Sequence, residues 1–259
     1  MMHPMLNVAV KAVRTTSRMM LRSMDQMDKV SISEKDHNDF VTSVDQASEL
    51  MLIEEIKKSY PRHAFLGEET GELTALKNEF CWIIDPLDGT TNFIHGFPQF
   101  CISMALMVKG QLELGLIYDP LRQDLFTATR GQGAYLNSHR MRVSTTTKMT
   151  DSLIATGLPF KNKETIKPFL LQLENVFTHC GDIRRTGSAA LDLAYVAAGK
   201  LDGYWEGGLK IWDIAAGILM IKEAGGAVTD FSGMEGYLES GHVVAGNRKI
   251  QRELLGILR

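Results

Sequence analysis

Three apolar stretches of strand length follow one another in the middle of the chain, and they restrict its fold more than any other feature. They span residues 100–108, 112–118 and 125–129, and their connections contain Lys109-Gly110 and Asp119-Pro120. Such residue pairs are typical of turns. Connections this short join antiparallel strands, because parallel strands need a long crossover. The sequence therefore predicts an antiparallel sheet here, and another strand-length run covers residues 80–84.

Helices are predicted on both sides of this sheet region. Residues 43–60 read as a helix, because Ser43 and Gln46 have capping-box spacing and Ala47, Leu50, Ile53 and Ile56 recur every three residues. In the C-terminal half, strands near residues 154, 203–205, 227–230 and 243–245 alternate with helices near 165–178, 188–198, 212–224 and 248–258. Gly199 and Gly225 stand where helix C-caps belong.

These elements predict an α/β fold, with an α+β N-terminal half and an α/β C-terminal half. Sheets should pack between helices around one continuous core. The chain has 259 residues, of which 44% are hydrophobic, so it can bury about 70–75% of its unfolded surface. We expect a single domain over residues 1–259, with lobes of about 1–145 and 146–259.

Composition narrows the function classes. The net charge of −3 excludes a chain whose overall charge drives binding to nucleic acid. Cys81, Cys101 and Cys180 are odd in number and widely spaced, which predicts reduced thiols in a cytoplasmic protein. The longest apolar run stops at Lys109 and is too short to cross a membrane.

The N-terminus carries a basic stripe formed by Lys11, Arg14, Arg18 and Arg22 at helical spacing. A transit peptide would give a similar pattern. We expect instead the protein's own first helix, with the stripe as its solvated face.

The richest chemistry lies in the segment 82–93, where an apolar strand delivers Asp85 to its carboxyl end. Pro86 turns the chain, and Asp88 follows before Gly89, Thr90 and Thr91. Two carboxylates at such a turn can converge on a hard cation, and the free N–H groups of a helix start can hold a phosphate. This is the layout that phosphoryl chemistry needs. A purely structural Asp-Pro turn with an Asp N-cap would have the same sequence, so this segment alone leaves both the catalytic and the structural interpretation open.

Further acidic residues add to this picture. Glu68 and Glu69 end the apolar run 64–66, and Asp213 opens a helix whose next residues are apolar or small. A solvated loop would explain the first pair, and a favourable contact with the helix dipole would explain Asp213. Because apolar residues flank Asp213, a paired or metal-bound acid is equally consistent with the sequence.

Other phosphatase classes are excluded by spacing. Asp85 and Asp88 form D-x-x-D, whereas a haloacid-dehalogenase-type site needs D-x-D. A cysteine phosphatase loop needs Arg six residues after Cys180, and position 186 is Thr. The chain has neither a P-loop nor a G-x-S-x-G elbow. With no histidine motif and no activated Ser or Cys, we assign the nucleophile to a metal-bound water.

Taken together, these segments resemble the inositol monophosphatase family, and its bacterial SuhB type in particular. The matching motifs are residues 82–93, 212–217 running to 223–226, 67–69, 184–190 and 39–45. The similarity covers nearly the whole chain. It implies a layered αβαβα fold like that of fructose-1,6-bisphosphatase, a homodimer, and two or three Mg²⁺ ions.

The resemblance also implies the metal ligands. Glu68, Asp85 and the Leu87 carbonyl would hold the first Mg²⁺, and Asp85, Asp88 and Asp213 would hold the second. A third, looser ion would touch Glu68. The four acidic side chains would repel one another in an empty site, so the site should attract divalent ions. A bound ion lowers the pKa of its water.

The remaining roles follow from the same resemblance. Thr90 and Glu68 would orient and deprotonate the attacking water, and Asp45 would hydrogen-bond Thr90. The substrate contacts would be Leu87, Asp88, Gly89, Thr90, Thr91, Arg184, Ala189, Glu206 and Asp213. Among these, Gly89, Thr90 and Thr91 would bind the phosphate, while Arg184, Ala189 and Glu206 would face the polyol. Lys35 would lie on a mobile loop near the ions.

The implied activity is a lithium-sensitive, Mg²⁺-dependent hydrolase of inositol monophosphates. Two alternatives stay open. One is a broader phosphatase of sugars, nucleotides or histidinol phosphate in the same superfamily. The other is a regulatory protein that binds RNA or the transcription machinery, for which the basic stripe at residues 11–22 is the one candidate feature.

Overall fold

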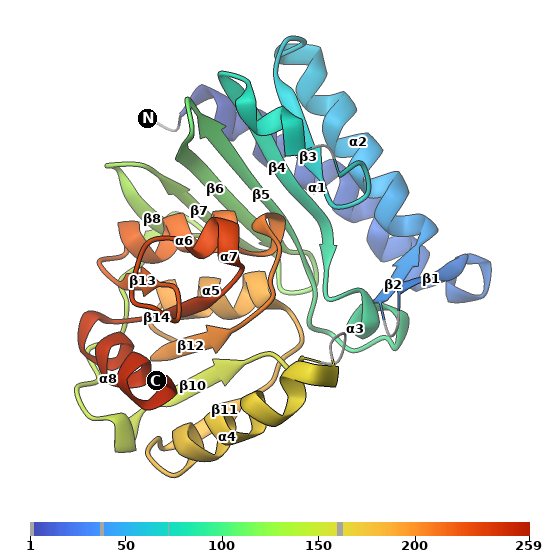
Figure 1. Ribbon diagram of the computed structural model, residues 1–259. Helices are drawn as coiled ribbons and strands as arrows, with labels where there is room; N and C mark the ends of the chain where they lie inside the picture. Colours follow the sequence, from blue (N-terminus) through green and yellow to red (C-terminus); the bar gives the residue numbers. More distant parts are fainter. Residues whose placement is uncertain (1–2, 37–38, 72, 160–162) are drawn as a thin grey trace.

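The predicted antiparallel strands lie at the centre of a seven-stranded sheet in the computed structural model (Figure 1). The structure describes residues 3–36, 39–71, 73–159 and 163–259, without the side chains of 34–40 and 163. The strand order is β3-β4-β5-β6-β7-β8-β9. The strands are β3 (Ala64–Gly67), β4 (Phe80–Asp88), β5 (Cys101–Val108), β6 (Gln111–Asp119), β7 (Asp124–Thr129), β8 (Gly133–Leu136) and β9 (His139–Arg140). Only the β3–β4 pair is parallel in this sheet, so the antiparallel prediction for β5, β6 and β7 is confirmed.

A second, five-stranded sheet occupies the C-terminal half. Its order is β11-β10-β12-β14-β13, and β10 runs parallel to both of its neighbours while β14 runs antiparallel to both of its own. The strands are β10 (Leu153–Thr156), β11 (Asp182–Arg184), β12 (Gly203–Glu206), β13 (Ala227–Thr229) and β14 (Val243–Gly246). A separate hairpin pairs β1 (Ile32–Asp36) with β2 (Asp39–Thr42).

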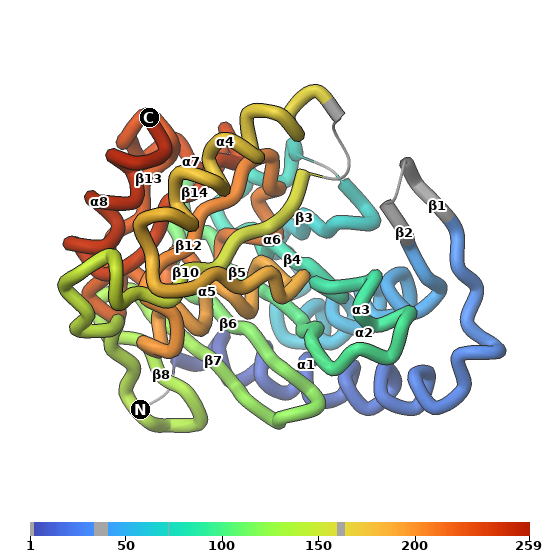
Figure 2. Tube along the Cα trace, turned by 90° about the horizontal axis from the view of Figure 1, so that it is seen from below, coloured from blue at the N-terminus to red at the C-terminus, as the bar shows by residue number. Residues whose placement is uncertain are grey.

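The helices form three layers around the two sheets. They are α1 (Pro4–Met24), α2 (Ser43–Ser59), α3 (Thr90–Ile94), α4 (Ile166–Phe177), α5 (Ala189–Ala197), α6 (Ile211–Glu223), α7 (Tyr237–Ser240) and α8 (Arg248–Leu258). The pair α1 and α2 covers one face of the large sheet, α5 and α6 lie between the sheets, and α4 and α8 cover the small sheet. Figure 2 shows the two outer pairs on opposite sides of the molecule. The αβαβα arrangement is confirmed.

The middle layer holds the largest apolar core. Buried side chains of α5 and α6 pack there with residues from both sheets. The approach of α6 to the large sheet is very close, since a Cβ at Gly115 of β6 would lie 2.8 Å from the Ala216 carbonyl oxygen. Because α6 of the second half packs on the sheet of the first half, the division into two lobes near residue 145 stays a prediction.

The first helix packs its apolar side chains into the core, and Lys11, Arg14, Arg18 and Arg22 lie exposed on α1. The three cysteines are free, as predicted. Among the described residues, the helices are too short or too polar to cross a membrane.

The predicted details of α2 were partly wrong. The cap is formed by Thr42 and Asp45, one residue before the predicted pair of Ser43 and Gln46. Leu50 is 58% exposed, although it belonged to the predicted apolar face. A spacing of three drifts around a helix of 3.6 residues per turn, so a run at that spacing leaves the buried face.

Candidate metal centre and active site

A cavity of about 630 Å³ lies where the two halves of the chain meet. Glu68 and the end of β4, with Asp85 and Asp88, line it from the large sheet. Glu206 at the end of β12 and Asp213 in the first turn of α6 line it from the second half. The fold therefore brings five of the predicted acidic site residues to one cavity.

Strand β4 does not end at Asp85, as the sequence suggested, but continues to Asp88 through an irregular register. Asp85 pairs with Ser103 of β5 and Asp88 with Cys101, so two residues of β4 face one of β5 between them. Pro86 fits in this bulge because a bulged residue needs no ladder N–H. Asp85 is only 2% exposed, and its Oδ1 accepts a hydrogen bond from the Leu87 N–H at 3.0 Å.

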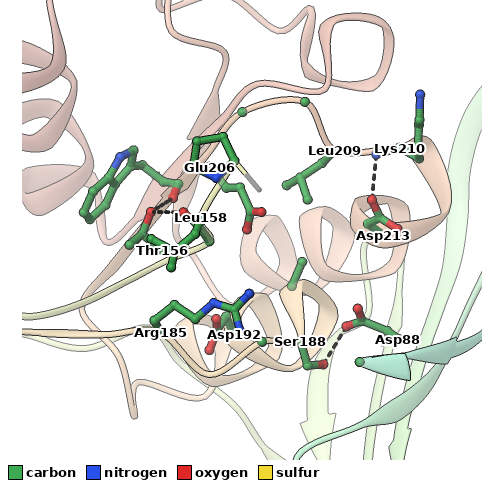
Figure 3. A pocket seen from close by; sticks show the side chains of 18 of the residues that line it. Asp88, Thr156, Leu158, Arg185, Ser188, Asp192, Glu206, Leu209, Lys210 and Asp213 are labelled. Carbon is green, nitrogen blue, oxygen red and sulfur yellow. Dashed lines mark hydrogen bonds between the residues drawn. The ribbon is translucent and has the colours of Figure 1, made fainter. Parts of the chain in front are cut away.

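Asp88 is held by the start of α5. Its Oδ2 accepts a hydrogen bond from the Ser188 hydroxyl at 2.5 Å (Figure 3) and another from the Ala190 N–H at 2.8 Å. Ser188 is also the N-cap of α5 and accepts from the Leu191 N–H. A carboxylate of the first half is thus fixed by a helix terminus of the second half.

Asp213 is fixed within its own helix. Its Oδ2 accepts from the Lys210 N–H at 2.6 Å, which caps the start of α6 (Figure 3). The favourable contact with the helix dipole, which the sequence allowed as a sole explanation, is therefore present. The same residue lines the cavity, and its role as a metal ligand stays a prediction.

The carboxylates interact electrostatically. Burial raises the pKa of Asp85 well above its usual range, and the charges of Glu68, Asp88 and Asp213 raise it further. Burial and the charge of Asp88 likewise raise the pKa of Asp213. A divalent cation would remove this repulsion, and carboxylate and carbonyl oxygens are the ligands that Mg²⁺ prefers. In the described part of the chain, no three acidic, His or Cys side chains form a closed ligand group, so this fit rests on donor chemistry and shared charge.

Thr90 and Asp45 lie beside this cluster. The Thr90 hydroxyl is 3.1 Å from Asp45 Oδ1 and 3.1 Å from the Leu87 carbonyl oxygen. The other oxygen of Asp45 accepts from the Thr42 N–H at 2.9 Å and from the Thr42 hydroxyl at 2.5 Å. Burial raises the pKa of Asp45. The Asp45–Thr90 contact that the resemblance implied is present.

The α3 segment presents backbone donors to the cavity. Gly89, Thr90 and Thr91 all line it. Gly89 is the N-cap of α3, with a φ of 96° that favours glycine. The N–H groups of a first helical turn have no acceptor within the helix, so they are available to an anion.

The wall opposite the metal ligands is polar and partly acidic. Tyr204 donates its hydroxyl to Glu206, and Thr186 donates to the buried Asp192 at 2.8 Å. Burial raises the pKa of Asp192 well above its usual range. Glu206, Asp192 and Arg185 surround the same space (Figure 3), and Ala189 also lines it.

The predicted Arg184 and its neighbour Arg185 lie in different places. Arg184 lies on β11, where it binds the Asp182 carboxylate at 2.5 Å, and it does not line the described cavity. Arg185 does line it. Arg185 follows the last residue of β11, and a substrate contact by Arg184 stays a prediction. Lys35 belongs to β1, and its side chain lies outside the described residues.

Sequence reasoning missed three polar residues near the cavity. Ser188 and Asp192 line it, and the buried Glu49 of α2 supports the turn that carries Glu68. Ser188 could have been found, because it precedes an apolar helix as an N-cap does. Glu49 had no local signal, since its partners are backbone groups about 20 residues away.

Comparisons with known proteins agree on one family. The model of the inositol monophosphatase family matches residues 1–259. The Nus factor SuhB of Escherichia coli is 49% identical over 258 residues, which cover 100% of this chain and 97% of that protein. The crystal structure of the extragenic suppressor protein SuhB from Bartonella henselae is 42% identical with a TM-score of 0.94, covering 98% of both chains. The Thermotoga maritima IMPase is 34% identical with a TM-score of 0.89, covering 98% of this chain and 96% of its own. The chain therefore belongs to the inositol monophosphatase family, whose fold supports a metal-dependent phosphatase.

Proposed function

We propose that the protein is a Mg²⁺-dependent phosphatase that hydrolyses inositol monophosphates and similar small polyol phosphates. One observation carries the proposal. The four carboxylates of Glu68, Asp85, Asp88 and Asp213, from three separate segments, line one cavity, and burial raises the pKa of Asp85, Asp88 and Asp213. Membership of the family supports the same chemistry.

The metal ligands in this proposal are Glu68, Asp85, Asp88, Asp213 and the Leu87 carbonyl, which would hold two or three ions. Bound Mg²⁺ supplies Lewis acidity toward water and toward phosphate oxygens. The protein's part is to keep the ligands in place. It does so through the hydrogen bonds to Asp85, Asp88 and Asp213.

Thr90 would orient the attacking water, and Glu68 would accept its proton. A hydroxyl has one proton and two acceptor lone pairs. When Thr90 donates to Asp45, its lone pairs are left to accept from water, so the water's oxygen is aimed away from Thr90. Asp45 is locked by Thr42 and fixes the direction of the Thr90 proton.

The substrate would bind across the cavity. The N–H groups of Gly89, Thr90 and Thr91 would hold the phosphate, and Glu206 and Ala189 would contact the polyol. The geometry favours Arg185 over the predicted Arg184 as the basic group nearest the substrate. Asp213 would lie beside the leaving oxygen, where a nearby positive ion offsets the developing negative charge.

The test measures phosphate release from inositol 1-phosphate, fructose 1,6-bisphosphate, 3′-phosphoadenosine 5′-phosphate and histidinol phosphate, with and without Mg²⁺. We expect Mg²⁺-dependent turnover with a clear preference for inositol 1-phosphate. A preference for another of the four would favour the broader phosphatase. Lithium at millimolar concentration should inhibit by competing at a Mg²⁺ position, and undiminished activity would contradict that expectation.

A second candidate is a regulatory role in transcription. It is favoured by the relatives named Nus factor SuhB and by the exposed basic stripe of α1. Asp85→Asn separates the two functions, because it should abolish turnover while leaving the surface of α1 intact. Partner binding that survives in this variant would support a regulatory role alongside the enzyme.

The homodimer and the cytoplasmic location stay predictions. Light scattering coupled to size-exclusion chromatography should give about twice the chain mass of 28.8 kDa. A mass equal to one chain at micromolar concentration would contradict the dimer.

A further inference from the structure

Helix α2 carries a second buried acid, one turn after Asp45. Glu49 is 1% exposed. Its two carboxylate oxygens accept from the backbone N–H groups of Glu69 at 2.9 Å and Thr70 at 3.0 Å. Burying a carboxylate costs free energy unless it is hydrogen-bonded, so these two hydrogen bonds are needed to keep Glu49 buried.

The partners of Glu49 belong to the turn that carries Glu68. The Glu68 N–H donates to the Ile84 carbonyl of β4 at 3.1 Å, and the Gly71 N–H donates to the Gly67 carbonyl at 2.9 Å. Successive N–H groups in such a turn form a concave site for an anion. The turn at residues 67–71 is therefore fixed to β4 on one side and to α2 on the other.

Gly67 shows how tightly the carboxylate of Glu49 is seated. A Cβ at this position would lie 2.2 Å from Glu49 Cδ and from its Oε2. The carboxylate thus packs directly against the Gly67 backbone. Any larger residue at position 67 would push it out of its place.

We infer that Glu49 is a positioning residue, which acts through the turn at 67–71 to set the place of the Glu68 carboxylate. The inference rests on the proposed function of Glu68. Residues four apart lie on the same face of a helix, so α2 presents Asp45 to Thr90 and Glu49 to the Glu68 turn. One rigid helix fixes both groups that would surround the attacking water.

The first experiment compares Glu49→Gln with Glu54→Gln, an equal charge change on the exposed side of the same helix. Isothermal titration calorimetry measures Mg²⁺ affinity, and steady-state assays with inositol 1-phosphate give kcat and KM. We expect Glu49→Gln to lower Mg²⁺ affinity and kcat by about 10–100-fold, as loss of a supporting contact does. KM should change less than twofold, and Glu54→Gln should match the wild type. Amide exchange at residues 69 and 70 should be faster in Glu49→Gln.

A second variant guards against a folding defect in the first. Gly67→Ala keeps the charge of Glu49 but displaces its carboxylate, so it should reproduce the loss of Mg²⁺ affinity. The double variant should lose little more than either single one, because both remove the same contact. Wild-type Mg²⁺ affinity in either single variant, or additive losses in the double variant, would overturn the inference. Glu68→Gln separates failure of this inference from failure of the proposed function. If Glu68 does not have its proposed role, Glu68→Gln should be fully active.

Discussion

At the scale of single residues, the site depends on carboxylates and hydroxyls that hydrogen bonds within the protein hold in place. Asp88 uses one oxygen for Ser188 and Ala190, and Asp213 uses one oxygen for the start of α6. In each case these bonds engage Oδ2. Preorganised ligands need little rearrangement when an ion or a transition state forms.

Thr90 tests the role of a single hydroxyl. Thr90→Ala removes the group that would orient the water, so kcat should fall by about 10²–10⁴-fold, the range of positioned proton-transfer groups. Thr90→Ser keeps the hydroxyl and should retain most of the activity. Measured by initial rates at saturating Mg²⁺, equal losses in both variants would refute the role of the hydroxyl.

Asp85 makes a prediction about stability and pH. Its pKa is raised in the folded protein, so between the unfolded and folded pKa values the native state binds more protons than the unfolded state. Stability of the metal-free protein is therefore lost as pH rises through this window. Asp85→Asn removes this penalty, which amounts to about 1.4 kcal/mol per pKa unit.

Urea unfolding in EDTA should therefore find Asp85→Asn more stable than the wild type at pH 7.5. The advantage should shrink as pH falls toward 4. A variant that is less stable at both pH values would contradict the repulsion argument.

At the scale of elements, α6 joins the site to the core. It begins beside the cavity with Asp213 and runs on against the large sheet, where Gly115 allows contact with Ala216. The alignment of Asp213 thus depends on close packing about one helical turn further along, at Ala216. Because protein interiors are close-packed, a displacement of α6 at this contact would move Asp213 as well.

Gly115→Ala should destabilise the fold by about 1–3 kcal/mol, because an added methyl must displace the backbone of α6. Gly256→Ala on α8 is the matched control, since a Cβ there meets nothing within 4 Å. Alanine favours a helix over glycine by about 1 kcal/mol, so the control should be stabilised or unchanged. Thermal unfolding measures both, and equal effects would contradict the close approach.

Elements with strong local patterns were predictable from the sequence. The strands β5, β6 and β7 and helix α8 were found because their apolar runs and turn residues are local. The hairpin of β1 and β2 was not, because its strands are short and polar. That Arg185 rather than Arg184 lines the cavity was not predictable, because the direction of a side chain at the end of a strand depends on tertiary structure, which no local pattern fixes. Glu49 was missed because its partners are backbone N–H groups, which every residue type other than proline has.

At the scale of the whole molecule, the candidate metal centre ties the two halves together. Asp85 and Asp88 come from the large sheet, and Asp213 comes from the helix layer behind it. An ion held by all three would bridge these layers. Binding that favours only the folded state adds stability by mass action, about 2.7 kcal/mol at 100 times Kd.

Removal of Mg²⁺ should therefore lower the melting temperature at pH 7.5, and restoring Mg²⁺ should recover it. Asp213→Asn should lose most of this response while keeping a folded structure. Calorimetry in EDTA and in 10 mM Mg²⁺, a concentration of the order used to saturate such sites, measures both proteins. The same Mg²⁺ response in the variant would show that Asp213 is not a ligand.

The arrangement of these acids also bears on how the chain reaches its native state. Glu68 and Asp85 meet when β3 pairs with β4, and Asp213 joins them only when α6 docks on the large sheet. The repulsion that Asp213 adds is therefore absent before this docking step. A divalent ion present at that step would offset the repulsion, so the same ion would aid folding as well as take part in the proposed reaction.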